Sequence, residues 1–209
     1  GEVIAAGVDR EDLFLATKVW TDGRAAGTAQ MRRSAELMNT DVIDLMQVHN
    51  LRDTDTHMDS IRELQEQKQV RYNGLTHYRA DALDALEAAM KQHRPQFIQI
   101  NYSIGEREAD QRVLPLAQDL GIAVIINRPY QAGRLFRAVG DEALPRWAAG
   151  FADSWGQFFL KFIISHPAVT CVIPATSKLR HMADTVRAGY GEMPEAATRQ
   201  KMVEFVRDL

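Results

Sequence analysis

Six short apolar segments recur along this chain, and each is followed by an amphipathic stretch. The apolar segments are rich in Val, Ile and Leu and cover residues 13–19, 42–49, 70–76, 97–102, 123–128 and 170–174. Apolar residues recur at helical spacing in residues 28–38, 56–67, 80–92, 111–120, 151–165 and 178–187. Strands this uniformly apolar are typical of parallel sheets that are covered on both faces. The pattern predicts six βα units.

The spacing of these strands favours a barrel. Most successive strands begin about 25 to 30 residues apart, which is typical of a closed (β/α)8 barrel rather than a doubly wound sheet. A doubly wound nucleotide-binding sheet would carry a glycine-rich turn after its first strand, and the chain has no GxGxxG motif. The longer stretch between residues 128 and 170 predicts a short extra helix over the barrel mouth. Residues 194–207 predict a last helix outside the sheet. We therefore expect a single α/β domain over residues 1–209, of the TIM-barrel type.

Composition excludes several classes of partner. The net charge is −3, and acidic and basic residues are mixed without a basic stripe or tail, so neither nucleic acid nor a membrane is expected as a partner. No apolar run reaches the length of a membrane span. The only cysteine, Cys171, excludes an internal disulfide, and its apolar neighbours predict a buried side chain. A cytoplasmic enzyme fits these features, although the chain begins with Gly and a targeting segment could lie upstream.

Two chemically capable side chains stand at the ends of successive strands. Lys18 lies near the end of the segment 13–19, and His49 ends the segment 42–49. In a parallel barrel both would face the mouth formed by the carboxyl ends of the strands, which is where such barrels keep their chemistry. The structural alternatives are a solvated rim lysine and a hydrogen-bonded structural histidine. Because both residues stand at the ends of successive strands, the pair points to an oxidoreductase site.

A series of motifs in a fixed order resembles the aldo-keto reductases. The motifs are Ala-Thr-Lys-Val-Trp at 16–20, Asp-Val-Ile-Asp-Leu-Met-Gln-Val-His at 41–49, Val-Arg-Tyr-Asn-Gly-Leu-Thr-His-Tyr at 70–78, Gln-Ile-Asn-Tyr-Ser at 99–103, Ser-His-Pro-Ala-Val at 165–169 and Val-Ile-Pro-Ala-Thr-Ser at 172–177. The resemblance implies a (β/α)8 barrel that binds NADPH across its mouth and reduces an aldehyde or ketone to an alcohol. In this family a tyrosine is the general acid, a lysine lowers its pKa, an aspartate holds the lysine and a histidine orients the carbonyl.

Lys18 and His49 match the lysine and histidine of that set. The tyrosine and aspartate come from a segment that follows the second strand of the family and precedes a helix whose end resembles residues 1–6. We therefore expect this chain to lack the first two strands, as a truncation, an incomplete gene product or the ordered part of a longer protein. No tyrosine in the chain can be assigned as the acid. The alternative function is a non-catalytic nucleotide-binding or interaction module on the same barrel.

The resemblance also assigns cofactor contacts. Thr76, His77 and Gln99 match positions that touch the nicotinamide carboxamide, although the family usually has Asn where His77 stands. After the fifth strand, either Arg128 or Tyr130 would cover the nicotinamide ring, and the alternative for both is ordinary loop structure. The remaining matches flank the adenosine 2'-phosphate or the adenine: Thr176, Lys178, His181, Asp184 and Thr185. A helix capped by Ser177 is the structural alternative at this turn.

Other features carry structural expectations. The histidines at 57, 93 and 166 have no ligand spacing, so no metal site is expected. Trp155, Phe158, Phe159, Phe162 and Ile163 recur at helical spacing and predict core packing. Asn73 replaces an apolar strand residue, so its amide requires a partner or exposure. Six strands of an eight-stranded barrel would leave two open edges, which could close on each other, pair with another copy of the chain or stay open.

Overall fold

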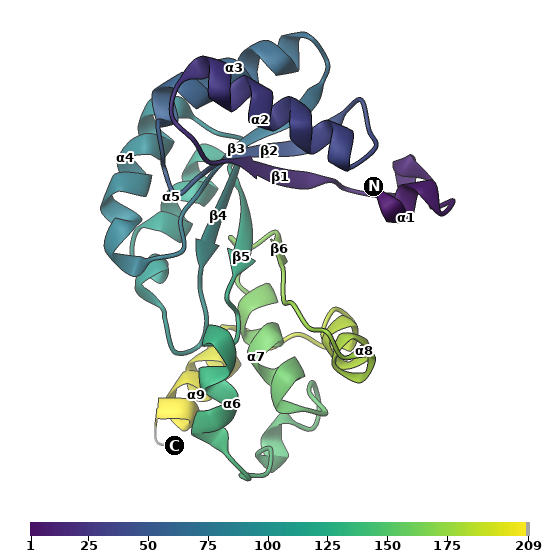
Figure 1. The fold of residues 1–209 in the computed structure, drawn as a ribbon. Helices are drawn as coiled ribbons and strands as arrows, with labels where there is room; N and C mark the ends of the chain where they lie inside the picture. Colours follow the sequence, from purple (N-terminus) through teal and green to yellow (C-terminus); the bar gives the residue numbers. More distant parts are fainter. Residues whose placement is uncertain (208–209) are drawn as a thin grey trace. The chain divides into compact units, whose positions relative to one another are not determined.

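The computed structural model describes residues 1–207 and divides into two compact units. The first unit contains Gly1–His77, Ala82–Gln99 and Leu120–Ile122, and the second contains the other described residues. All six expected strands are present, with helices between them (Figure 1). Each unit is described separately below.

Parallel strands form the frame of the first unit. They are β1 (Ala16–Val19), β2 (Ile43–His49), β3 (Val70–Thr76) and the beginning of β4 (Phe97–Asn101). Each strand pairs with the next in chain order. Since the strands are parallel, their carboxyl ends lie at one edge of the sheet. The candidate residues near the strand ends lie at this edge: Lys18, His49, Thr76 and Gln99.

Helices cover one face of these strands. They are α2 (Arg24–Leu37), α3 (Thr54–Glu66) and α4 (Leu83–His93), and a short α1 (Glu2–Ala5) precedes β1. In Figure 1, α2 and α3 run along the same side of β1, β2 and β3. The strand residues beneath them are fully buried: Val19, Met46, Val48, Leu75 and Ile98. This face is the core of the first unit, and the alternate residues of each strand point the other way.

The opposite face carries aromatic residues at its amino end and polar residues at its carboxyl end. Phe14, Tyr72 and Phe97 form an aromatic cluster with ring centroids 5.4 to 6.3 Å apart. Phe14 is 55% exposed and Tyr72 is 39% exposed. Lys18, His49 and Thr76 lie at the other end of this face. The face therefore changes from apolar to polar along the strands.

The second unit is built around α7 (Trp155–Ile164), which contacts β6 and α8. Strands β5 (Ala123–Asn127) and β6 (Cys171–Val172) pair in parallel. The other helices are α5 (Val113–Leu120), α6 (Arg134–Val139), α8 (Leu179–Arg187) and α9 (Ala196–Arg207). Short 3₁₀ turns across the two units occupy Arg10–Asp12, Ala80–Ala82, Glu108–Asp110, Gln131–Gly133 and Arg146–Ala148. Eight of the ten α7 residues are buried, so this helix is the centre of the unit's core.

The expected elements are confirmed, with shifts at their ends. β3 has the predicted bounds, whereas β1 and β6 are shorter: the N–H of Leu15 donates to the Asp44 side chain and not to the backbone of β2, and Pro174 follows β6 closely. The insertion between β5 and β6 contains the predicted short helix, α6. The prediction that Cys171 is buried is wrong: its side chain is exposed, because β6 has β5 on one side and no strand on the other among the described residues.

Two further expectations have clear outcomes. Asn73 is 8% exposed, and its amide is paired at both ends: Nδ2 donates to Gln65 Oε1 at 2.7 Å, and Oδ1 accepts from the N–H of Gln96 at 3.1 Å. Phe158, Phe159, Phe162 and Ile163 are buried as predicted, whereas Trp155 is only half-buried. Within residues 1–207, no helix is both long enough and apolar enough to span a membrane.

Candidate active site

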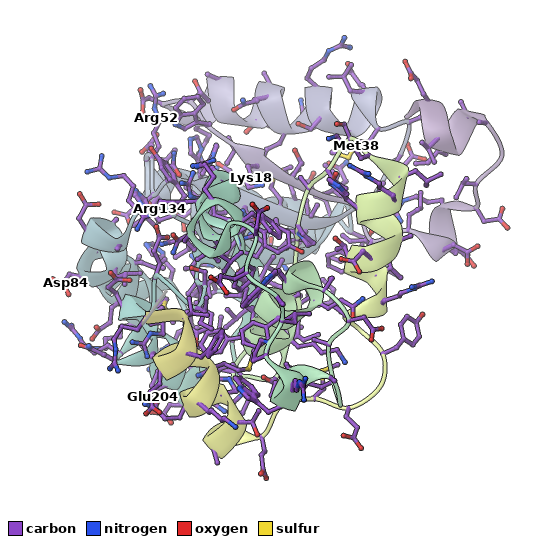
Figure 2. The ribbon with its side chains drawn as sticks, turned by 90° about the horizontal axis from the view of Figure 1, so that it is seen from below. Lys18, Met38, Arg52, Asp84, Arg134 and Glu204 are labelled. Atoms are coloured by element: carbon purple, nitrogen blue, oxygen red, sulfur yellow. The ribbon has the colours of Figure 1, made fainter. Side chains whose placement is uncertain are left out.

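Lys18 and His49 lie on neighbouring parallel strands and share the polar end of the sheet. Lys18, labelled in Figure 2, is in register with Gln47 of β2, two residues before His49. Burial lowers the pKa of Lys18. Burial also lowers the pKa of His49, and the nearby charges of Lys18 and His77 lower it further. His49 is therefore a neutral imidazole at neutral pH, able to donate one hydrogen bond and accept another.

The predicted carboxamide-binding residues form a row with His49 across three strands. The register pairs His49 with Thr76, and Thr76 with Gln99. Thr76 and Gln99 are 2% and 7% exposed, and the N–H of His77 donates to the carbonyl oxygen of Gln99 at 3.0 Å. The register of the parallel strands thus brings together four candidate residues from three separate segments of the sequence: His49, Thr76, His77 and Gln99.

Gln47 is a buried polar residue that the sequence analysis did not single out. Its side chain is fully buried, and neither amide atom has a hydrogen-bond partner among the described residues. A Cβ placed on Gly74, its register partner on β3, would lie 3.1 Å from Cγ of Gln47, so the glycine leaves room for this side chain. The sequence feature that could have identified this residue is a glutamine inside an otherwise apolar strand segment. Gln47 stands directly opposite Lys18 in the register of β1 and β2.

The turns after β1 and β2 add an aromatic and two charged residues beside His49. Trp20 packs edge-on against His49, with ring centroids 5.4 Å apart. The guanidinium of Arg52, labelled in Figure 2, lies 5.9 Å from the centroid of Trp20 and forms a two-point ion pair with Asp22. None of these contacts was predicted, because they depend on how two irregular turns pack together.

The second unit contains a cavity of about 680 Å³ that collects most of the other predicted cofactor residues. The predicted residues that line it are Arg128, Tyr130, Thr176, His181, Asp184 and Thr185. Phe136 and Trp155 add aromatic walls. The guanidinium of Arg128 lies 5.9 Å from the ring centroid of Tyr78, so a cation and an aromatic ring are close at one side of the cavity. Lys178 does not line the cavity and is exposed at the start of α8.

The two loops that bound this cavity have distinctive backbones. After β5, Arg128, Gln131, Ala132 and Gly133 all have positive φ angles, of 51°, 50°, 54° and 83°. Such angles are uncommon for residues other than glycine and often occur at binding loops. Before α8, the N–H of Lys178 donates to Thr176 Oγ1 at 3.1 Å. Lys178 is the N-cap and its side chain makes no capping bond, so Ser177 does not cap the helix.

Asp184 is engaged by the beginning of α7. Its carboxylate accepts from Ser154 Oγ at 2.6 Å and from Gln157 Nε2 at 2.7 Å. Ser154 is also the N-cap of α7 and accepts from the N–H of Gln157 at 3.1 Å. Asp184 therefore fixes α8 to α7 at the edge of the cavity.

Polar side chains at the carboxyl ends of parallel strands are typical of α/β enzymes, and the comparisons identify the family. The chain belongs to the aldo/keto reductase family, whose model matches residues 1–199. It is 32% identical to the uncharacterized oxidoreductase YrpG of Bacillus subtilis, over 87% of this chain and 68% of that protein. It is 24% identical to the uncharacterized oxidoreductase YqkF of the same species, over 86% of this chain and 69% of that protein.

Solved structures show the same fold. The holo form of the aldo-keto reductase AKR11C1 from Bacillus halodurans superposes with a TM-score of 0.76 at 23% identity, over 97% of this chain and 75% of that one. A thermostable aldo-keto reductase, Tm1743 in complex with the inhibitor epalrestat, gives a TM-score of 0.79 at 19% identity, over 98% and 75%. The predicted family and fold class are thereby confirmed, and family membership supports a general oxidoreductase function.

Proposed function

We propose that this protein is an NADPH-dependent reductase that converts an aldehyde or ketone to an alcohol. The observation that carries the proposal is the row of His49, Thr76 and Gln99 at the carboxyl ends of adjacent parallel strands, with Lys18 beside it. This is the part of a parallel barrel that holds its chemistry.

The proposed roles follow from protonation states. The neutral imidazole of His49 donates an N–H to the carbonyl oxygen and fixes its direction. The ammonium of Lys18 lowers the pKa of a neighbouring phenol and so prepares it to give up its proton. The tyrosine that carries this phenol in the family has no match among the 209 residues, and neither has the aspartate that holds the lysine.

The residues of the second-unit cavity suit a dinucleotide. Arg128 and Tyr130 offer a planar cation and an aromatic ring for stacking, Thr176 offers a hydroxyl, and His181 can meet a phosphate. Lys178 adds a cation at the beginning of α8, where negative charge is favoured. In the first unit, Thr76, His77 and Gln99 would hold the carboxamide. When bound, NADPH supplies a hydride. We propose NADPH and not NADH because the resemblance assigns Thr176, Lys178 and His181 to the 2'-phosphate, which NADH lacks.

A paired binding and turnover experiment tests this proposal. The fluorescence of NADPH is titrated with wild type, His181→Ala and Lys18→Met, and turnover is measured on a panel of aldehydes and ketones. We expect His181→Ala to weaken NADPH binding and leave the weaker binding of NADH unchanged. Lys18→Met should keep NADPH binding and lower kcat by about 10² to 10⁴, which is the contribution of acid–base catalysis.

Three outcomes would contradict the reductase proposal. They are absence of NADPH binding, equal turnover in Lys18→Met and wild type, and NADPH binding without turnover of any carbonyl compound. The last outcome would support the alternative of a non-catalytic nucleotide-binding module. The intact mass of the protein in the same sample shows whether the measured protein consists of these 209 residues or of a longer chain.

A further inference from the structure

Three contacts join the turn after β1 to the region that follows β2. Nε2 of His57 donates to the carbonyl oxygen of Thr21 at 2.8 Å, and Gly23 N–H donates to Asp53 at 2.7 Å. The third contact is the ion pair of Arg52 with Asp22, in which Nε meets Oδ1 at 2.8 Å and Nη2 meets Oδ2. Two nitrogens facing two oxygens fix the plane of the guanidinium as well as its position.

Trp20 lies between this ion pair and His49. Its backbone N–H donates to Gln30 Oε1 at 2.8 Å, which fixes the main chain at the start of the turn. The indole meets His49 on one side, at 5.4 Å with an interplanar angle of 60°, and the Arg52 guanidinium on another, at 5.9 Å. Trp20 is 53% exposed, so the hydrophobic core does not fix the position of its indole.

The ring of His49 depends on this indole. Its side chain makes no hydrogen bond to any residue from 1 to 207, and it is only half-buried. A histidine whose ring nitrogens are both unpaired takes its orientation from the groups packed around it, and the indole of Trp20 packs against this ring. Whatever holds Trp20 therefore also holds His49.

We propose that Arg52 is a positioning residue: paired with Asp22, it keeps Trp20 against His49 and so sets the direction of the imidazole that meets the substrate carbonyl. We call Asp22, Arg52 and Trp20 the latch. The pairing lowers the pKa of Asp22 and raises that of Arg52, so the ion pair persists across the neutral range. The consequence for the substrate rests on the proposed function, whereas the effect on His49 does not.

The test measures His49 without cofactor or substrate. In a ¹H–¹³C NMR spectrum, the ring current of Trp20 displaces the Cε1–H resonance of His49, which is assigned by its loss in His49→Asn. We expect Trp20→Leu to return the resonance to the position typical of an isolated histidine. Arg52→Gln and Asp22→Asn should each move it part of the way. The double variant should move it no further than either single one, because both break the same contact.

The matched control is Arg24→Gln. Arg24 forms another exposed ion pair in the same unit, in which Nη1 donates to both carboxylate oxygens of Glu63 at 2.6 and 2.7 Å, and its guanidinium lies over no aromatic ring among residues 1–207. This variant should leave the His49 resonance unchanged. The latch is excluded if Arg52→Gln and Asp22→Asn leave the resonance at its wild-type position, or if Arg24→Gln moves it as far as they do.

Turnover separates this proposal from the proposed function. If the protein reduces carbonyl compounds, Arg52→Gln should lower kcat/KM for the carbonyl by about three- to tenfold and leave the Kd for NADPH unchanged, since only the imidazole is misplaced. If no turnover is found, the NMR result still decides whether the latch exists. An unchanged kcat/KM in an active enzyme whose His49 resonance has moved would overturn the catalytic consequence.

Discussion

Asp44 is a buried residue that the fold holds in its charged form. It is fully buried and accepts from Arg10 Nη2 at 2.7 Å, Leu15 N–H at 2.8 Å and Arg71 Nη1 at 2.8 Å. Burial alone would raise the pKa of this carboxyl, but the hydrogen bonds from Leu15, Arg71 and Arg10 outweigh it and lower the pKa below its ordinary value. The charged form is therefore the one that stabilises the folded protein.

We expect Asp44→Asn to lower the free energy of unfolding by about 2 to 3 kcal/mol at neutral pH. This is less than a fully buried pair would lose, because the Arg71 side chain is 66% exposed. Since the folded pKa is depressed, the stabilisation is complete above the unfolded pKa of about 3.9 and is lost as pH falls through the lower folded value. Urea unfolding should show the two proteins converging only in acid.

A variant of an exposed pair provides the comparison. Asp59 pairs with Arg62 one helical turn away and is 60% exposed, so Asp59→Asn should change the free energy of unfolding by less than about 0.5 kcal/mol. An Asp44→Asn variant as stable as Asp59→Asn would contradict the role given to Asp44. So would a stability difference that persists unchanged into strong acid.

Individual site residues differ in how far the sequence predicts them. Lys18 and His49 were predictable because both stand at strand ends, and strand direction decides where strand ends lie. The need for partners at Asn73 was predictable because a buried amide is costly. Trp20, Arg52 and Gln47 were not, because their contacts depend on turn conformations and side-chain packing that have no sequence periodicity.

At the scale of elements, one serine makes hydrogen bonds in both α7 and α8. Ser154 caps α7 and also donates to Asp184 of α8, so its hydroxyl belongs to both helices. We expect Ser154→Ala to cost about 1 to 2 kcal/mol in the free energy of unfolding, which is typical for the loss of an N-cap. Amide hydrogen exchange should accelerate in the first turn of α7 and in α8 together.

Ser34→Ala is the corresponding control for a helical serine. Among the described residues, the Ser34 hydroxyl donates only to the carbonyl oxygen of Gln30 within α2, at 3.1 Å, so its removal should leave exchange in α7 and α8 unchanged. Faster exchange in α7 with normal exchange in α8 would show that the Ser154–Asp184 contact does not connect the two helices.

The ends of elements explain most differences between prediction and structure. Hydrophobic periodicity located every strand and every main helix, since it reflects which face is covered. It did not locate the start of β1 at Ala16, after Leu15 has donated its N–H to the Asp44 side chain, or the two-residue length of β6. The burial of Cys171 was predicted from apolar neighbours, but burial in a strand also requires a second neighbouring strand.

At the scale of the whole molecule, β1 pairs only with β2 among the described strands, and we propose its other side as a surface for self-association. Leu45 N–H donates to the carbonyl oxygen of Leu15, which directs the Thr17 N–H toward β2 and the Ala16 N–H away from it. We expect the chain to associate with a second copy through this edge. Ala16→Pro removes the outward N–H at the first position of the strand and should weaken association about tenfold.

Sedimentation velocity over a wide range of concentrations measures this association. Ala16→Gly keeps the N–H and should associate as the wild type does. A wild-type chain that stays monomeric at every concentration would rule out the edge as a self-association surface, as would equal association of Ala16→Pro and Ala16→Gly.

The packing of His57 against α2 means that a residue of this helix also affects the geometry of the candidate site. A Cβ on Gly27 would lie 2.4 Å from Cε1 of His57, so any larger residue there must displace the ring that holds Thr21. Thr21 adjoins Trp20, and Trp20 orients His49. A glycine in the first turn of α2 is thus tied, through His57, Thr21 and Trp20, to the orientation of His49, although it carries no chemical group of its own.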